Sequence, residues 1–133
     1  MDNTASAHAA ALWAGLHIVL LLVLSVMVVR LRQKHKIALG DEGIPELARA
    51  IRAFGNAAEY VPAGIGAIAV LAVAGASALT IHIIGVILFA GRLLHAIALS
   101  NSGGTSLGRA IGIILTWVAY IFAAVTLLFF AIA

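Results

Sequence analysis

Residues 9–29 read AAALWAGLHIVLLLVLSVMVV, an apolar run interrupted only by His17 and Ser25. A helix needs about 20 such residues to cross the roughly 30 Å of hydrocarbon in a bilayer. Positive charges follow this run instead of preceding it, and the run is longer than the apolar region of a secretory signal peptide. We therefore expect it to remain in the mature protein as a transmembrane helix.

Three further apolar runs of similar length lie downstream, at about residues 45–74, 78–99 and 107–131. Pro45 is suited to open the first of them, because a helix leaves its first N–H groups unpaired in any case. We expect an all-α fold, a single domain over residues 1–133 that forms a bundle of four transmembrane helices.

The composition excludes several classes of protein. Of the 133 residues, 64% are hydrophobic and 10% are charged, and none is cysteine. Soluble domains carry about 25% charged residues, so a soluble enzyme, a disordered tail or a nucleic-acid-binding module is ruled out. Without cysteine there is no disulfide and no thiol nucleophile of the protein itself.

The distribution of basic residues predicts the topology. Cytoplasmic loops carry an excess of lysine and arginine. Here the first loop is basic, Arg109 lies beside the third loop, and the second loop and both ends of the chain have neither lysine nor arginine. We therefore expect both termini to face away from the cytoplasm. The basic residues of the first loop are Arg30, Arg32, Lys34 and Lys36.

Polar side chains form a stripe along the second span. Arg52, Asn56 and Glu59 are spaced at i, i+4 and i+7, which places them within about 60° of one another on one helix face. Ionisable residues inside a span are costly, and they mark functional sites or pair with one another.

A second polar patch lies in the third span, where Arg92 and His95 are three residues apart and share a face. Both belong to the cytoplasmic half, as the stripe does, and Arg30 and Arg109 lie at span ends on the same side. Arginine exceeds glutamate there. This excess indicates an anionic, polar ligand, because the guanidinium is a fixed cation suited to carboxylates.

Other interpretations of these polar residues remain open. Arg52 or Arg92 would fix the helix register if it paired with Glu59, and Asn56 would bond across a helix interface. Small residues in the last three spans serve packing either within one chain or between subunits. An oligomer is the expectation, since a thin four-helix protomer does not easily enclose a polar site.

His17 and His82 are interpreted as packing residues, because neither has a neighbour at ligand spacing. His82 and His95 are thirteen residues apart, on nearly opposite helix faces. We expect no metal or haem site.

The run from Arg52 to Pro62, RAFGNAAEYVP, resembles the second-helix signature of the MAPEG family, the membrane-associated proteins in eicosanoid and glutathione metabolism. That signature reads Arg-x-x-x-Asn-x-x-Glu-x-x-Pro, and Arg52, Asn56, Glu59 and Pro62 fill its fixed places. Tyr60 matches the leukotriene synthase branch. The resemblance extends over the four spans, the basic first loop and the Arg-x-x-His pair, and it is to a bacterial-type member similar to microsomal glutathione transferases.

The resemblance implies a homotrimer that binds glutathione as co-substrate between neighbouring subunits at the cytoplasmic side. It also implies that an arginine, either Arg109 or Arg92, stabilises the thiolate, which attacks a lipophilic substrate entering from the bilayer. The residues expected to hold glutathione are Arg30, Arg52, Asn56, Glu59, Tyr60 and His95.

Two positions depart from the leukotriene synthase branch. His95 stands where that branch has tyrosine, and Phe54 replaces a glutamine. His95 is a substitute hydrogen-bonding group, a general base, or a group that solvates Arg92.

The leading hypothesis is an enzyme of a bacterial cytoplasmic (inner) membrane. It would be a detoxifying glutathione transferase or glutathione-dependent peroxidase, acting on hydrophobic electrophiles or lipid hydroperoxides. The alternative is a non-catalytic lipid-binding or scaffold trimer. A third class, a small channel or transporter, needs polar faces across both leaflets, whereas the non-cytoplasmic halves of the spans are nearly free of charge.

Overall fold

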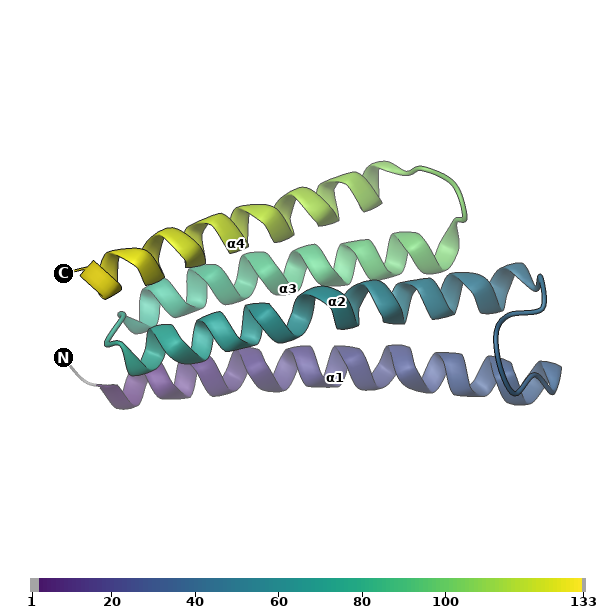
Figure 1. Ribbon diagram of the computed structural model, residues 1–133, viewed down its shortest axis with the longest axis horizontal. Helices are drawn as coiled ribbons and strands as arrows, with labels where there is room; N and C mark the ends of the chain where they lie inside the picture. The colour runs from purple at the N-terminus through teal and green to yellow at the C-terminus, as the bar shows by residue number, and fades with distance from the viewer. Residues whose placement is uncertain (1–2, 133) are drawn as a thin grey trace.

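The computed structural model describes residues 3–132, which form four helices joined by short connections (Figure 1). The helices are α1 (Asn3–His35), α2 (Pro45–Val73), α3 (Ala78–Asn101) and α4 (Leu107–Ile132). Each is long and apolar enough to cross a membrane. The all-helical fold with four membrane-spanning helices is therefore confirmed.

Helix α1 is longer than the apolar run that predicted it. It begins at Asn3 and continues through the basic segment to His35, which at 1.5 Å per residue is about 50 Å. The helix therefore extends beyond a hydrocarbon layer of about 30 Å, and Arg30 and Lys34 lie on its last turns. Lys34 Nζ and His35 Nε2 contact Glu46 Oε1 of α2 at 2.8 and 2.5 Å.

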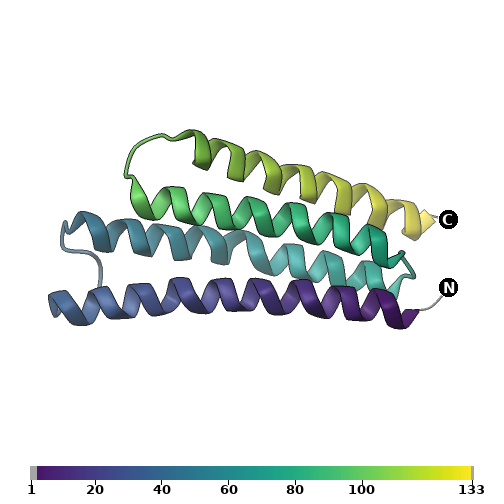
Figure 2. The ribbon, with the colours of Figure 1, turned by 180° about the vertical axis from the view of Figure 1, so that it is seen from behind.

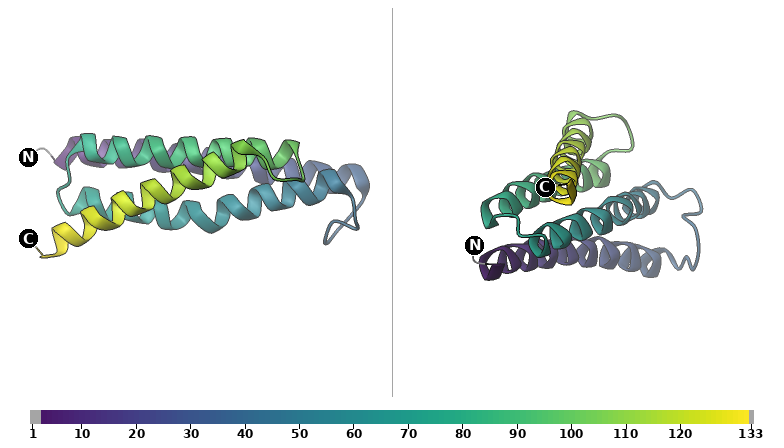
Figure 3. Two further views of the ribbon diagram at one scale, coloured as in Figure 1. Left: turned by 90° about the horizontal axis from the view of Figure 1, so that it is seen from above. Right: turned by 60° about the vertical axis from the view of Figure 1, so that its left-hand side comes forward.

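The two central helices are α2 and α3, and α1 and α4 pack on opposite sides of them (Figures 2 and 3). Within the described residues, α1 and α4 do not touch each other. The start of α1, the end of α4 and the turn at residues 74–77 lie at one end of the bundle (Figure 1). The connections 36–44 and 102–106 lie at the other end, where the polar residues gather.

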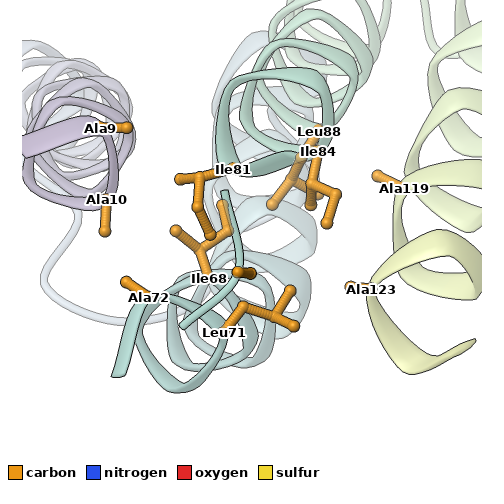
Figure 4. Close-up of a cluster of buried hydrophobic side chains, with 11 residues drawn as sticks. Ala9, Ala10, Ile68, Leu71, Ala72, Ile81, Ile84, Leu88, Ala119 and Ala123 are labelled. Atoms are coloured by element: carbon orange, nitrogen blue, oxygen red, sulfur yellow. The ribbon is translucent and has the colours of Figure 1, made fainter. Parts of the chain in front are cut away.

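The larger of two apolar core clusters lies in the half of the bundle away from those connections, and a smaller one that includes Leu24, Ala53 and Leu99 lies in the other half. Ile68, Leu71, Ile81, Ile84 and Leu88 come from α2 and α3 and are almost completely buried. Small residues of α1 and α4 close the cluster on either side (Figure 4). In lipid, helix association depends on such close packing. The small residues that pack against this core are Ala9, Ala10, Ala119 and Ala123.

Much of the apolar surface of the outer helices is exposed. Leu22 of α1 is 60% exposed and Ile121 of α4 is 64% exposed. Such a surface is costly in water over a large contiguous area, but it suits a helix that faces lipid. The protomer thus has a small interior and a large apolar exterior.

Candidate functional site

Arg92 is the centre of a buried polar cluster at the level where α2, α3 and α4 meet. Its side chain is only 1% exposed. Nε donates a hydrogen bond to Thr116 Oγ1 at 2.8 Å, and Nη1 donates to Asn56 Oδ1 at 2.8 Å. Because Asn56 belongs to α2 and Thr116 to α4, one guanidinium joins three helices.

The charge of Arg92 is compensated by neutral groups. Its Cζ lies 4.8 Å from the centre of the Tyr60 ring, a cation–π contact. Thr116 Oγ1 in turn donates a hydrogen bond to the Gly112 carbonyl oxygen at 2.8 Å. The Tyr120 hydroxyl donates to the Tyr60 carbonyl oxygen. Of the residues that the structure describes, no carboxylate contacts Arg92.

Two glycines bring α3 and α4 close together beside this cluster. A Cβ atom on Gly112 would lie 2.7 Å from both the Cβ and the backbone nitrogen of His95, and 2.8 Å from the Gly91 carbonyl oxygen. A Cβ on Gly91 would lie 2.9 Å from the Gly112 carbonyl oxygen. The position of Thr116, and hence its bond to Arg92, depends on this close approach.

A hollow of about 370 Å³, the His95 hollow, opens above the cluster toward the connection between α3 and α4. It is bordered by Asn56 and by His95, whose side chain is 8% exposed. The asparagine therefore faces two ways, because its amide oxygen binds Arg92 while the residue also borders the hollow. The remaining residues of the His95 hollow are Thr105, Ser106, Arg109, Ala110 and Ile113.

A second hollow of about 340 Å³, the Arg52 hollow, adjoins the first through Arg109. It is lined by three arginines and by no carboxylate. Two adjoining spaces with several cations and no anion suit a ligand that carries negative charge. The residues of the Arg52 hollow are Pro45, Ala48, Arg49, Arg52, Leu99, Gly103 and Arg109.

Arg109 lies in the first turn of α4 and borders both hollows. The helix begins there because the Ser106 Oγ accepts a hydrogen bond from the Arg109 backbone N–H at 3.3 Å, which is a typical N-terminal cap. Arg109 Nη1 donates to the Gly104 carbonyl oxygen at 2.6 Å. This bond holds the guanidinium at the mouth of the two hollows and leaves its remaining N–H groups for a ligand.

Arg52 and Glu59 lie on the outer surface of α2. Both are exposed, and within residues 3–132 neither has a hydrogen bond or an ion pair. Glu59 lies at the middle of the helix. The proposed pairing of Glu59 with Arg52 or Arg92 is therefore not what the protomer contains.

Arg30 borders a third hollow, of about 370 Å³, between α1, α2 and α3. Within one protomer this hollow contains neither Arg109 nor His95. The predicted site residues are thus divided. The His95 hollow contains Asn56, His95 and Arg109, and the Arg52 hollow contains Arg52 and again Arg109. The buried cluster contains Arg92 and Tyr60, and the third hollow contains Arg30.

Three residues of the polar cluster were not predicted from the sequence. Thr116 and Tyr120 bind Arg92 and the Tyr60 carbonyl, and Gly112 permits the helix contact. Thr116 and Tyr120 are four residues apart and so share a face of α4. This spacing could have identified a polar face on α4 from the sequence. Nothing in the spacing linked that face to Arg92.

His17 and His82 pack against aromatic residues. His17 is fully buried, its Nδ1 donates to the Trp13 carbonyl oxygen at 2.6 Å, and its ring meets Phe89 edge-on. His82 accepts a bond from Trp13 Nε1 at 3.1 Å. Among residues 3–132, no group of three histidine, aspartate or glutamate side chains is placed to hold a metal ion.

The similarity of the chain to known proteins identifies its family. The chain is 46% identical over 85 residues to the inner membrane protein YecN of Escherichia coli strain K12, and equally similar to the YecN protein of Escherichia coli O6:H1. The aligned region covers 64% of this chain and 65% of each relative. The profile of the MAPEG family matches residues 10–129. Since that match covers most of the chain and extends over parts of all four helices, the chain belongs to the MAPEG family.

Proposed function

We propose that the protein is a membrane-bound glutathione transferase or glutathione-dependent peroxidase. The observation that carries this proposal is the pair of adjoining hollows lined by Arg49, Arg52 and Arg109 and by no carboxylate. They lie at the end of the bundle where the spans meet the first and third connections. A polar anion entering from water and an apolar substrate entering from lipid would both reach this place.

The charges of glutathione complement those of the hollows and of the neighbouring surface of α2. Its two carboxylates suit the arginines of the hollows, and its ammonium group suits Glu59, which lines neither hollow and has no partner within the described protomer. The two hollows, of about 340 and 370 Å³, are within the range of about 300–1,000 Å³ typical of small-molecule sites. Asn56 and His95 add hydrogen-bonding groups next to Arg109.

Arg109 is the better candidate for the group that stabilises the thiolate. It borders both hollows and commits only Nη1 to the protein. Arg92, in contrast, is buried and bound to Asn56 and Thr116. We assign Arg92 the part of a positioning residue, which holds Asn56 in place. A cation beside a thiol favours the thiolate and so lowers the thiol pKa.

The proposed transferase reaction forms a bond between the glutathione sulfur and an electrophilic carbon, and the leaving group departs with its electron pair. In the peroxidase reaction, a lipid hydroperoxide is reduced to an alcohol and water while two glutathione molecules are oxidised to their disulfide. In both, the thiolate is the nucleophile. The protein supplies the cation that stabilises it and the apolar route for the substrate.

The proposed assembly is a homotrimer in the inner membrane, with both termini away from the cytoplasm. An unpaired carboxylate on a lipid-facing surface is costly, and Glu59 lies exposed at mid-helix. A neighbouring protomer packed against this face would shield Glu59 and Arg52. The relative's name, inner membrane protein, supports the choice of membrane.

Glutathione binding to detergent-purified protein, measured by calorimetry, tests the proposal, with thiolate absorbance followed during a pH titration. Arg52→Ala and Glu59→Ala each remove one charge that has no partner within the described protomer. Arg32→Ala is the matched control, because Arg32 donates to the Gly40 carbonyl oxygen in the first connection, away from the hollows.

The transferase is supported if glutathione binding is retained by Arg32→Ala and lost in Arg52→Ala and Glu59→Ala. The bound thiol should also ionise below its solution pKa. Wild-type protein that does not bind glutathione at millimolar concentration overturns the assignment. The charged stripe would then belong to a non-catalytic trimer of the same fold.

A further inference from the structure

A groove between α1 and α3 lies on a different face from the arginine-lined hollows. It has a volume of about 260 Å³ and runs along the two helices from Leu20 to Asn101. Its walls are almost entirely apolar, and Val23 and Ile97 are each 51% exposed at its rim. The groove is therefore open to whatever surrounds the bundle.

The apolar groove leads into a positively charged mouth. Met27 and Ser100 line both the groove and the third hollow, which also contains Arg30 and Arg49. The two spaces are thus continuous, and the charged one lies at the end of the bundle next to the first connection. This combination has the layout of an amphiphile site, with an apolar channel and a cationic end.

The cations at the mouth are free to bind an anion. Arg30 is exposed and has no hydrogen bond or ion pair within the described part of the chain. Arg49 commits only Nε, which donates to the Ser100 carbonyl oxygen at 3.2 Å. The one carboxylate at the mouth, Glu46, already bonds Lys34 Nζ at 2.8 Å and His35 Nε2 at 2.5 Å.

The length of the groove matches one leaflet. Leu20 and Arg30 are ten residues apart on α1, which is about 15 Å along the helix axis. Half of a hydrocarbon layer of about 30 Å is the same distance. An acyl chain lying in the groove would therefore end near the bilayer centre, with its headgroup beside Arg30 and Arg49.

We propose that this groove is a binding site for an anionic phospholipid. An acyl chain lies between α1 and α3, and the phosphate binds Arg30 and Arg49. Basic pockets between transmembrane helices on the cytoplasmic side are a recurring way to hold anionic headgroups. The site involves no residue of α4, although Arg49 also lines the Arg52 hollow.

Native mass spectrometry of delipidated protein in detergent tests the proposal, by comparing retention of phosphatidylglycerol with that of phosphatidylcholine carrying the same acyl chains. Val23→Trp fills the groove, and Val19→Trp is its matched control, because Val19 is similarly exposed on α1 but does not line the groove. Arg30→Gln removes one charge at the mouth. Arg109→Gln removes an equal charge at the same end of the bundle, outside the groove.

Wild-type protein should retain phosphatidylglycerol in preference to phosphatidylcholine. Arg30→Gln should weaken that binding about fivefold, since a basic residue near the membrane surface contributes roughly 1 kcal/mol to anionic lipid binding. Val23→Trp should abolish it, while Val19→Trp and Arg109→Gln should retain it. Equal binding of the two lipids, or equal effects of the two tryptophan variants, would overturn the proposal.

A second copy of the chain is the competing occupant of the groove. Because the chain has no cysteine, Val23→Cys gives a single labelling site, with Val19→Cys as control. A fluorophore at position 23 should be quenched more strongly by nitroxide-labelled phosphatidylglycerol than by the labelled phosphatidylcholine. Formation of a disulfide between two copies of Val23→Cys under mild oxidation would show that protein covers the groove, and would overturn the lipid site.

Discussion

The guanidinium of Arg92 lies against the ring of Tyr60, with 4.8 Å between Cζ and the ring centre, whereas Glu59, the preceding residue, is exposed. The polar residues near Arg92 and on α2 therefore form an inner layer and an outer layer. The inner layer is satisfied by Asn56 and Thr116 and holds the helices together. The outer layer consists of Arg52 and Glu59. Their side chains have no hydrogen-bond or ion-pair partner within the described protomer, so they can bind a ligand or a neighbouring protomer.

Arg92→Gln should destabilise the bundle. The substitution removes the bonds to Asn56 Oδ1 and Thr116 Oγ1, and each hydrogen bond to a charged group contributes about 1.5–3 kcal/mol. The thermal unfolding midpoint in detergent should fall by several degrees. Arg109→Gln, at the mouth of the hollows, should leave the midpoint unchanged. Equal midpoints for the two variants would contradict the inner role of Arg92.

The Tyr60 ring should stabilise the Arg92 charge independently of its hydroxyl group. Tyr60→Phe keeps the ring over the guanidinium and also keeps the backbone carbonyl to which Tyr120 donates. Tyr60→Leu removes the ring, and should cost about 0.5–2 kcal/mol of stability. Unfolding in a denaturing detergent titration measures both. If Tyr60→Phe is destabilised as much as Tyr60→Leu, the ring contact is not the cause.

Gly112→Ala should separate α3 from α4. The new Cβ would lie 2.7 Å from the His95 Cβ and backbone nitrogen and 2.8 Å from the Gly91 carbonyl oxygen, and backbone atoms cannot rotate away. Overpacking of this kind costs about 1–3 kcal/mol. Gly66→Ala is the control, because a Cβ there meets no atom within 4 Å. A Gly112→Ala protein as stable as the Gly66→Ala protein would show that the helices yield easily.

The sequence predicted the helical architecture well because it depends on the length and apolarity of each run. Pro45, Ala78 and Leu107 begin helices where the spans were expected. The length of helix α1 was underestimated, because the apolar run ends before Arg30 whereas the helix continues to His35. Hydropathy reports where lipid begins, and it does not report where a helix ends.

The candidate site was predicted only in part. The i, i+4, i+7 spacing correctly grouped Arg52, Asn56 and Glu59 on α2, but it did not tell an inward residue from an outward one. Asn56 binds the buried Arg92, while its two neighbours in the stripe face outward. That distinction depends on where α3 and α4 pack, and the contact between Gly91 and Gly112 that sets their distance leaves no periodic signal.

Arg109 and Arg52 should affect different steps of the proposed reaction. Both border the same hollow, but Arg109 also faces the space beside Asn56 and His95, where the thiol is expected, whereas Arg52 lies toward the outer surface of α2. Arg52→Gln should raise the glutathione KM by about tenfold to a hundredfold, the factor that one charged hydrogen bond of about 1.5–3 kcal/mol contributes. Its kcat should change little.

Arg109→Gln should lower kcat with a much smaller change in KM, because a cation that stabilises the thiolate acts on the reacting sulfur more than on the bound tripeptide. The pH at which the bound thiol ionises should rise in this variant and stay unchanged in Arg52→Gln, which thiolate absorbance measures directly. Arg109→Lys should restore part of kcat, since a lysine supplies a charge without the planar fork. If Arg92→Gln alone raised the ionisation pH while its unfolding midpoint stayed at the wild-type value, the thiolate would be assigned to Arg92 instead, and the buried cluster would be part of the reaction centre.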